Sequence, residues 1–410
     1  MWNFRDVEGI DEDGMLVHSS MYRNLVTNNP KFFLECPDFL FDIEKTLYDH
    51  LNQSAPRDYT QSGDLDGQKS RGLQTEQLDQ SCGFDCFPSS NFVLKYLNDI
   101  TNHFSLKDCI RFKSWVDWVA YDEQAEKFQV TVRDLNDDNK RKFLEQFDYV
   151  IIASGHYTQP NYVSYPGEET FPGTVIHAKF FMDADRYKGK RLLIVGSSFS
   201  AEDLAMQSIR AGAARVTISY RTCPMNLKFP PNVDEKPLLT QIRGSTVSFR
   251  DGSSCDYDVI IYCTGYLYEF PYMEKSIRIS ISAKKDMPLY RQVVLPTNPR
   301  VMYIGVQNLA YTFPLFWLQG HFCAQIIRGD VQLPPLAEMV EDTEREEQAR
   351  STHNSILEKI EFQSEYLNRM SSLLGKPTVE GLDIARQWLK DRDDDVKTYK
   401  QKTHFHSKYR

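Results

Sequence analysis

The residues best suited to chemistry form a run of small residues between an apolar segment and a helical pattern. The run consists of Gly196, Ser197, Ser198, Ser200 and Ala201. A glycine here permits a tight turn after a strand, and Ala201 lets the following helix lie close to the sheet. Ser198 stands where such turns carry a second glycine, and the amides of the helix N-terminus would bind a pyrophosphate. The run predicts a dinucleotide-binding turn, with a purely structural turn as the alternative.

A second strand pattern, residues 215–221, follows this turn and ends at Arg221. No acidic residue stands there, where a carboxylate would bind the ribose 2′-hydroxyl of NAD. A guanidinium can instead offer a forked pair of donors to the 2′-phosphate of NADP. The strand therefore favours NADPH over NADH as the nucleotide. The alternative is an exposed arginine that happens to follow a strand.

Two apolar runs, residues 148–155 and 258–265, resemble each other closely. Each ends in a hydroxyl residue and a glycine, which are Thr264 and Gly265 in the second run. Continuous apolar runs are typical of buried parallel strands, and a terminal glycine lets the backbone pass close to a ligand. Thr264 and Gly265 are therefore candidate cofactor-binding residues, unless the two runs are unrelated core strands.

The elements that must position these residues form an alternating α/β pattern. Helical spacing runs from Asn91 to Phe104, strand patterns cover 115–120 and 128–132, and a polar turn covers 136–142. Residues 190–220 predict a strand, turn, helix and strand. The polar residues 52–83 predict a surface insertion. After Pro335 the sequence predicts solvated helices at 338–350 and 356–374 and a tail, 391–410, without a role.

Composition bounds the class of protein. The 410 residues carry a net charge of −9, with 41% hydrophobic and 26% charged residues, which indicates a globular chain and no nucleic-acid partner. No signal peptide or apolar run of membrane-spanning length is present. We therefore expect a cytoplasmic protein, free to associate with a membrane without a transmembrane helix. Among the eight cysteines only Cys82 and Cys86 lie close together, which predicts no metal site.

A motif upstream of the turn makes the chain resemble a known family. Residues 171–181 carry the pattern F-x-G-x3-H-x3-[YF], with His177 and Phe181 at its end. This pattern is the signature of flavin-containing monooxygenases, and the related Baeyer–Villiger enzymes carry tryptophan where Phe181 stands. The resemblance therefore favours N- or S-oxygenation. We interpret His177 as a packed, hydrogen-bonded residue.

The resemblance to this family extends over about residues 2–335. Further stretches that agree with it are 19–31, 37–39, 87–89, 153–160, 263–266 and 313–319.

The resemblance implies a cofactor site and a reaction. Asn28 matches the family's asparagine beside the flavin ring, with Thr27 and Asn29 as neighbours, and Trp2 matches a tryptophan that touches FAD. A carboxamide can donate and accept without adding charge, so Asn28 is the predicted catalytic residue. In the family, NADPH reduces FAD, and one atom of O2 then passes to a soft amine or sulfide. We expect the activity to be of the N,N-dimethylaniline monooxygenase type.

The resemblance also implies two dinucleotide-binding, Rossmann-like domains, the NADPH domain being inserted in an FAD domain that is incomplete at its N-terminus. We expect the FAD domain at 1–163 and 289–335, the NADPH domain at 164–288 and a charged helical extension at 336–410. The G-x-G-x-x-G unit that opens family members is absent from the sequence. Two alternatives therefore stay open: an NADPH-binding remnant without stable FAD, and a disulfide reductase, for which no redox C-x-x-C is found.

Overall fold

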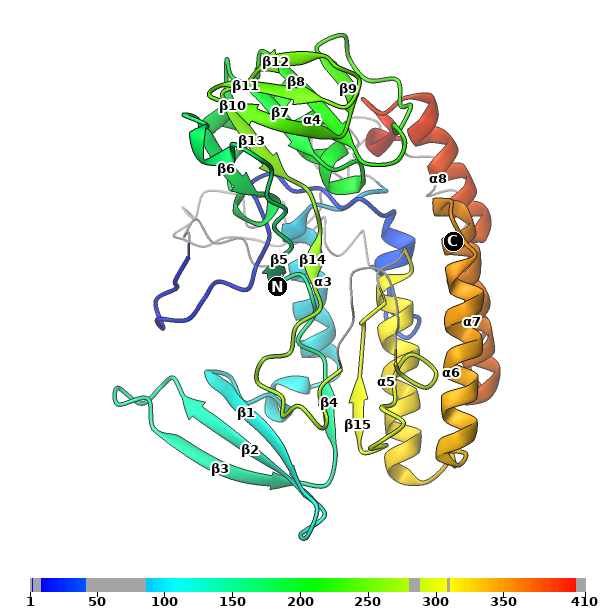
Figure 1. The fold of residues 1–410 in the computed structure, drawn as a ribbon. Helices are drawn as coiled ribbons and strands as arrows, with labels where there is room; N and C mark the ends of the chain where they lie inside the picture. Colours follow the sequence, from blue (N-terminus) through cyan, green and yellow to red (C-terminus); the bar gives the residue numbers. More distant parts are fainter. Residues whose placement is uncertain (1, 3–8, 42–85, 280–287, 308–309, 403–410) are drawn as a thin grey trace, which may run out of the picture.

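A computed structural model describes residues 2, 9–41, 86–279, 288–307 and 310–402. An α/β unit lies at one end of the molecule and an antiparallel sheet at the other, with long helices along one side (Figure 1). The predicted insertion at 52–83, which includes Cys82, falls outside the described residues. The connections contain short 3-10 helices: η1 (Lys31–Leu34), η2 (Leu106–Cys109), η3 (Glu168–Thr170), η4 (Ala178–Phe180), η5 (Ala184–Tyr187) and η6 (Tyr399–Gln401).

The α/β unit is built on a five-stranded parallel sheet. Its order is β6 (Thr174–His177), β13 (Val259–Tyr262), β7 (Arg191–Val195), β8 (Arg215–Tyr220) and β9 (Val233–Pro237). Helix α4 (Phe199–Arg210) connects β7 to β8, which confirms the predicted strand–turn–helix–strand unit. Both faces of the central strands are covered, so their apolar runs are fully buried.

Each face of this sheet packs against a different element. Leu204 and Ala205 of α4 pack on one face, against Leu192 and Ile194 of β7. The other face packs against a small antiparallel sheet of β10 (Leu239–Arg243), β11 (Thr246–Phe249) and β12 (Ser254–Asp256). The alternate residues of β7 thereby enter two separate cores, as the alternation of side chains along a strand requires.

Two short pairings connect segments that flank the α/β unit in the sequence. Strand β4 (Val150–Ile152) runs parallel to β15 (Val301–Tyr303), and β5 (Gln159–Pro160) pairs with β14 (Tyr266–Leu267). The predicted strand at 148–155 is thus present, but it is not buried on both faces. Ile151 is 40% exposed because β4 pairs with a single strand among the described residues.

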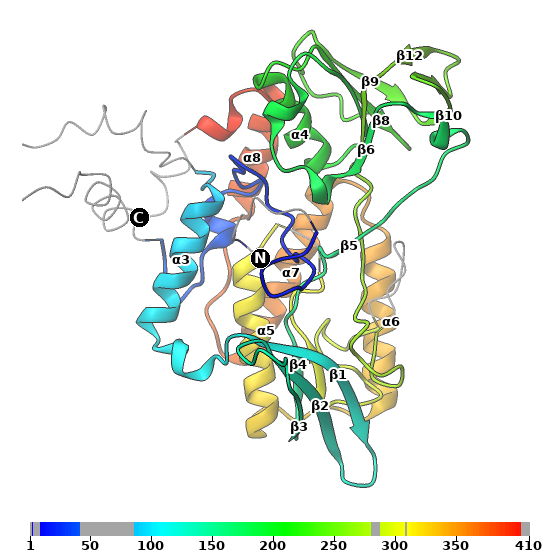
Figure 2. The same ribbon diagram turned by 90° about the vertical axis from the view of Figure 1, so that its left-hand side faces the viewer.

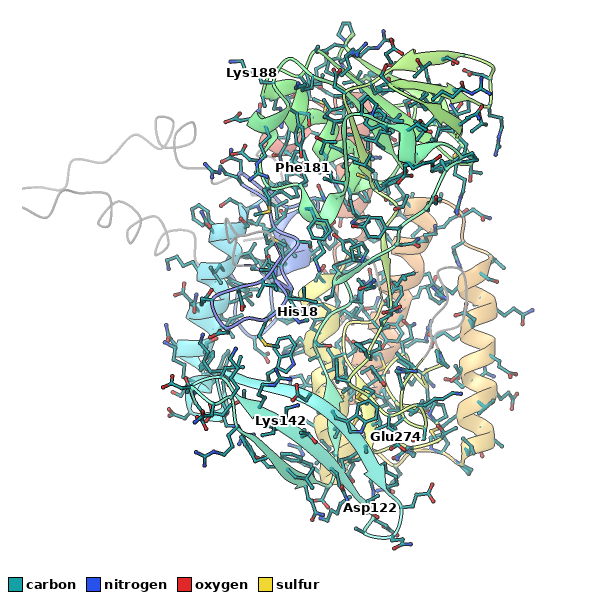
Figure 3. The ribbon with its side chains drawn as sticks, turned by 60° about the vertical axis from the view of Figure 1, so that its left-hand side comes forward. His18, Asp122, Lys142, Phe181, Lys188 and Glu274 are labelled. Atoms are coloured by element: carbon teal, nitrogen blue, oxygen red, sulfur yellow. The ribbon has the colours of Figure 1, made fainter. Side chains whose placement is uncertain are left out.

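Residues 90–147 confirm three local predictions. Helix α3 (Ser90–His103) is capped by Ser89, whose hydroxyl accepts from Phe92 N, and the antiparallel sheet follows with β1 (Ser114–Asp122), β2 (Lys127–Asp134) and β3 (Lys142–Phe147). The turn predicted at 136–142 connects β2 to β3. Glu274 accepts from Tyr121 N at 3.0 Å and ties β1 to the chain that leaves the α/β unit (Figure 3).

The C-terminal helices correct one prediction. Helix α6 (Leu336–Ser351) is largely exposed, as expected, but α7 (Ile356–Leu374) is not a solvated helix. It packs along α5 (Thr312–Arg328), as the ribbon in Figure 2 shows, and shares the largest core of the described chain. Helix α8 (Leu382–Asp394) completes that core with Trp388. The charged residues of α7 occupy one face only, and overall charge content concealed the apolar stripe opposite them.

Truncation of one α7 leucine should show that this helix is part of the core. Leu367 is 0% exposed, so Leu367→Ala should lower the free energy of unfolding by about 2–5 kcal/mol. Leu373 of the same helix is 47% exposed, and Leu373→Ala should change it by less than about 0.5 kcal/mol. Urea unfolding measures both values. Equal effects of the two substitutions would contradict the burial of α7.

Candidate cofactor-binding site

The glycine turn after β7 is fixed by close backbone packing. Gly196 has φ +125°, and a Cβ at this position would lie 2.3 Å from the carbonyl oxygen of Cys263. Its N–H donates to Ser219 O at 2.9 Å, so the turn lies between the carboxyl ends of β13 and β8. Only glycine fits both the backbone angle and the space. Ala201 is 0% exposed, as its predicted contact between helix and sheet requires.

The first turn of α4 leaves donors available at this edge of the sheet. The first four N–H groups of a helix have no acceptor within the helix. Ser198 occupies the N-cap position without a side-chain capping bond, both it and Ser200 are exposed, and Ser197 is half-buried. This arrangement suits an anionic group, because the amides and the helix dipole both favour negative charge.

Arg221 follows the last residue of β8, at the same edge of the sheet. Its side chain is exposed and forms no ion pair with a described residue. The guanidinium is thus free to bind a ligand that extends from the glycine turn across β8. A 2′-phosphate on an adenosine ribose has the charge and the oxygen atoms for this contact.

Thr264 and Gly265 lie where the chain leaves β13, and their polar groups bind other protein groups. Thr264 Oγ1 donates to Asn161 O at 2.5 Å, and Asn161 N donates to Gly265 O at 3.0 Å. His177 Nε2 also donates to Gly265 O, at 3.0 Å. These contacts hold the crossing between the α/β unit and the rest of the chain, and the Thr264 hydroxyl is already engaged within the protein.

The predicted packing of His177 is confirmed. The residue is 0% exposed, and its Nδ1 accepts from Lys179 N at 3.1 Å. Nδ1 therefore carries no proton, which leaves Nε2 as the donor to Gly265. Burial lowers the pKa of His177 to about 4. The neutral ring thus acts as a fixed two-sided connection and not as a proton carrier near neutral pH.

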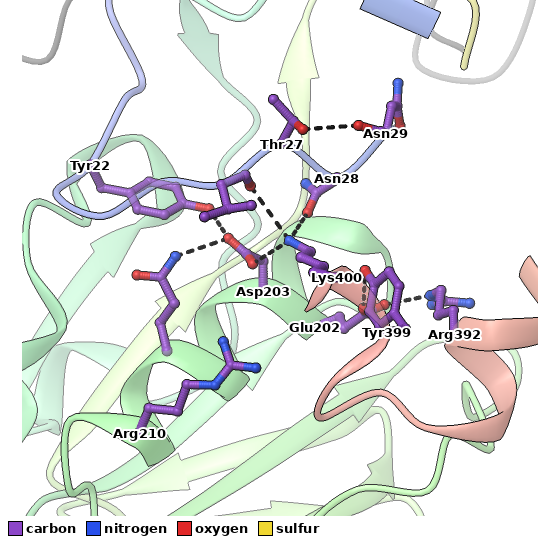
Figure 4. A network of polar contacts seen from close by, with 12 residues as sticks. Tyr22, Thr27, Asn28, Asn29, Glu202, Asp203, Arg210, Arg392, Tyr399 and Lys400 are labelled. Atoms are coloured by element: carbon purple, nitrogen blue, oxygen red, sulfur yellow. Dashed lines mark hydrogen bonds and ion pairs between the residues drawn. The ribbon is translucent and has the colours of Figure 1, made fainter. Parts of the chain in front are cut away.

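The loop that carries Asn28 is anchored on both sides. Thr27 N donates to Pro88 O at 3.0 Å, and Thr27 Oγ1 donates to Asn29 O at 2.9 Å. Asn29 Nδ2 donates to Ala310 O at 3.0 Å. Thr27 and Asn29 are therefore committed to shaping the loop, while the half-buried Asn28 carboxamide faces α4 and the C-terminal segment (Figure 4).

A polar network that the sequence did not predict connects Asn28 to α4. Lys400 Nζ donates to Asn28 Oδ1 at 2.9 Å and to Asp203 Oδ1 at 2.8 Å, and Tyr22 donates to the other oxygen of Asp203 (Figure 4). Glu202, the preceding residue, forms an ion pair with Arg392 at 2.6 Å. The C-terminal residues 391–402 thus have a structural role, contrary to prediction. The sequence feature that could have indicated this role is the pair of adjacent carboxylates, Glu202 and Asp203, in a helix expected to pack on a sheet.

Tyr22 also joins this network to the family motif. Its ring meets Phe181, the last residue of that motif, edge-on with the ring centroids 5.5 Å apart. Burial, reinforced by the charge of Asp203, raises the pKa of Tyr22 well above its usual value. Tyr22 therefore stays protonated and keeps donating to Asp203.

Other polar groups gather near the ends of β4 and β15. His156 is 8% exposed, and burial lowers its pKa to about 4. Its Nε2 and both amide atoms of Gln307 are buried without a hydrogen-bond partner among the described residues. Buried polar atoms in proteins are nearly always paired, so these atoms are candidate contacts for a ligand. Sequence reasoning missed both residues, because neither carries a recognisable motif.

The predicted site residues thus form three groups. The turn at 196–201 lies against Cys263, next to Thr264 and Gly265, and Arg221 lies one strand away. Asn28 is brought to the same helix through Lys400. Trp2 packs elsewhere, against a cluster formed by Leu34, Val93, Tyr96 and Phe313. No helix of the described chain has both the length and the apolarity to cross a membrane.

The fold and this site define an α/β protein with a tight glycine turn at the carboxyl edge of a parallel sheet. A family model described as flavin-binding monooxygenase-like matches residues 82–228 and 226–393. The chain therefore belongs to the flavin-binding monooxygenase-like family, and with it to the flavoprotein monooxygenases.

The relatives cover nearly the whole chain. A trimethylamine monooxygenase from Methylocella silvestris is 32% identical over 408 residues, which are 98% of this chain and 82% of the relative. The crystal structure of Tmm from Pelagibacter sp. is 29% identical with a TM-score of 0.83, covering 98% of this chain and 83% of that one. An S-allyl-L-cysteine S-oxygenase from Allium sativum, 24% identical, has a TM-score of 0.77 over 98% and 86% of the two chains.

The buried ring of His177 predicts acid sensitivity. Its folded-state pKa of about 4 lies below the ordinary 6.5, so only the unfolded chain takes up this proton between those values. The contribution of the neutral His177 ring to the free energy of unfolding is therefore fully present above pH 6.5. It is lost as the pH falls toward 4, by up to about 3 kcal/mol.

His177→Gln keeps a donor for Gly265 and removes the titration. We expect a shallower dependence of the free energy of unfolding on pH between 4 and 6.5 than in the unsubstituted chain. The slope for His177→Gln is compared with that of a matched control, His103→Gln, which makes the same replacement at an exposed position. Chemical denaturation at several pH values tests this, and an unaltered slope in His177→Gln would refute it.

Proposed function

We propose that this chain is an NADPH- and FAD-dependent monooxygenase that transfers one oxygen atom to the nitrogen of a small tertiary amine. Trimethylamine is the first candidate substrate, N,N-dimethylaniline is a second, and soft sulfides are the related class. For an amine the overall reaction is R3N + NADPH + H⁺ + O2 → R3NO + NADP⁺ + H2O. The observation that carries the proposal is the 98% coverage of this chain by trimethylamine monooxygenases.

Nucleotide binding is supported by the glycine turn and the helix start that follows it. Gly196 packs directly against the Cys263 carbonyl, and the first amides of α4 lie at the same edge of the sheet. In this proposal the pyrophosphate of NADPH lies against residues 196–201. Arg221 binds the 2′-phosphate, and Thr264 and Gly265 hold the strand crossing beside it.

Flavin binding is supported by the unpaired polar atoms of His156 and Gln307 and by the Asn28 loop. In this proposal Trp2, Thr27, Asn28 and Asn29 line the FAD site from one side. FAD would supply the hydride acceptor and the site of oxygen activation. The protein then contributes binding, orientation and exclusion of water.

Asn28 is the proposed catalytic residue. Its Oδ1 accepts from Lys400, so the amide Nδ2 is directed away from the ammonium group and is free to donate. An uncharged donor can orient a polar oxygen without protonating it. In the proposed reaction it holds the oxygen that is transferred, while the packed C-terminal segment keeps bulk water from the same place.

We further infer a two-domain architecture of Rossmann-like units. Residues 164–288 form the NADPH domain, inserted between parts of the FAD domain at 1–163 and 289–335, with residues 336–410 as a helical extension. The parallel pairing of β4 with β15 supports this division, because those strands flank the insert in the sequence.

A second candidate is a chain that binds NADPH without retaining FAD. This candidate would use the predicted dinucleotide-binding turn at Gly196 for NADPH. A disulfide reductase is the weakest alternative, since the sequence holds no C-x-x-C pair.

The activity can be measured directly on the purified full chain. We expect a yellow flavin absorption, oxidation of NADPH that depends on trimethylamine, and formation of the N-oxide detected by mass spectrometry. Asn28→Ala should lower the yield of N-oxide per NADPH oxidised by about tenfold or more, as loss of one oriented donor predicts. A colourless protein that still binds NADPH would support the second candidate and contradict oxygenation.

The nucleotide preference tests Arg221. Arg221→Ala should raise KM for NADPH about tenfold or more and leave KM for NADH nearly unchanged, because only NADPH carries the 2′-phosphate. Arg215→Ala is the matched control, since Arg215 begins the same strand at its other end and binds Asp234 at 3.0 Å. Equal losses with both nucleotides in Arg221→Ala would refute the assignment.

A further inference from the structure

We propose that Lys400 is a positioning residue for Asn28: its ammonium group holds the carboxamide so that the amide NH2 faces the flavin site. The inference rests on the proposed function for the place of the flavin beside Asn28. The contact itself belongs to the fold and can be tested without turnover.

All three donors of Lys400 have protein acceptors. Nζ lies 2.9 Å from Asn28 Oδ1, 2.8 Å from Asp203 Oδ1 and 3.5 Å from Val26 O. Its side chain is only 15% exposed. An ammonium group has three N–H donors, so this geometry uses each of them and fixes the direction of the side chain.

The contact selects one orientation of the Asn28 amide. Lysine has donors and no acceptor, so only the oxygen of a carboxamide can face it. The Nδ2 group of Asn28 is therefore turned to the opposite side, and it forms no hydrogen bond with a described residue. Without the ammonium group the amide could rotate by half a turn and present an acceptor where the reaction needs a donor.

Asp203 keeps Lys400 in place and is itself held by two donors. Tyr22 donates to its Oδ2, and Gln207 Nε2 donates to the same atom at 3.2 Å (Figure 4). Asp203 is 5% exposed, and a buried carboxylate is stable only when it is paired. The network from Tyr22 to Asn28 is thus one connected unit.

The C-terminal segment that carries Lys400 is docked on the start of α4. Trp388 stacks on Phe199 with ring centroids 5.6 Å apart, and Arg392 lies over the same ring at 4.9 Å. Tyr399, next to Lys400, donates to Glu202 Oε1 at 2.9 Å. Arg392 and Lys400 therefore neutralise the acid pair of α4, so that these carboxylates do not repel phosphate at the helix N-terminus.

Misdirected oxygen chemistry gives the inference a specific readout. A coupled turnover consumes the amine, NADPH, H⁺ and O2 and yields the N-oxide, NADP⁺ and water. An uncoupled turnover consumes NADPH, H⁺ and O2 without the amine and yields NADP⁺ and H2O2. Loss of the oriented donor should divert turnover to peroxide, whereas general loosening of the fold lowers both routes together.

The first test measures the contact through thermal unfolding of the full chain. Asn28→Ala, Lys400→Met and the double variant form a cycle, and we expect the double variant to lose about 2 °C less than the sum of the single losses. The control cycle combines Asn28→Ala with Lys402→Met. Lys402 pairs with Asp391 at 2.8 Å in the same segment, so the thermal losses of these two substitutions should be additive. Additive losses for Asn28 and Lys400 would overturn the proposal.

The second test measures the share of oxidised NADPH that appears as H2O2. Lys400→Met should raise this share about fivefold, the factor that one hydrogen bond of ~1 kcal/mol provides. Lys400→Arg should restore most of the coupling, because it keeps charge and donors, and Lys402→Met should match the unsubstituted chain. An unchanged peroxide share in Lys400→Met refutes the positioning role. An unsubstituted chain that oxidises no NADPH contradicts the proposed function instead, and the thermal cycle still decides the contact.

Discussion

Two adjacent carboxylates near the start of α4 set the main constraint on this molecule. Glu202 and Asp203 are 2% and 5% exposed, and removal of one partner from such a buried ion pair destabilises a protein by about 3–5 kcal/mol. Both partners, Arg392 and Lys400, come from a segment nearly two hundred residues away. The C-terminal segment is therefore required by α4, and it binds that helix close to its N-terminal end.

This constraint explains how the two ends of the chain meet. The Asn28 loop is held by the segment before α3 and by Ala310, and Lys400 reaches it from the other side. The packing of α7 and α8 against α5 fixes where the segment after α8 begins, and so how far that segment must extend to bring Lys400 to Asn28. Packing of these helices and placement of one carboxamide are thus parts of the same arrangement.

The glycine turn depends on a different force, which is steric. The carbonyl of Cys263 lies so close to Gly196 that no side chain fits, and the parallel pairing of β7 and β13 holds the two strands at this spacing. The same close approach leaves the helix amides exposed at the sheet edge. Helix α4 therefore takes part in both features. Its first backbone amides follow the glycine turn, and its side chains Glu202 and Asp203 bind the C-terminal segment.

The sequence by itself determined what local patterns control. Apolar runs located β7, β8 and β13, glycine and small residues located the turn, and helical spacing located α3, because these features depend on neighbours within a few residues. The motif ending at Phe181 indicated the family. Only the tertiary structure decided the burial of α7, the exposure of Ile151 and the role of Lys400. Those outcomes depend on which distant segment covers a face or pairs with a charge, and no local pattern in the chain encodes that partner.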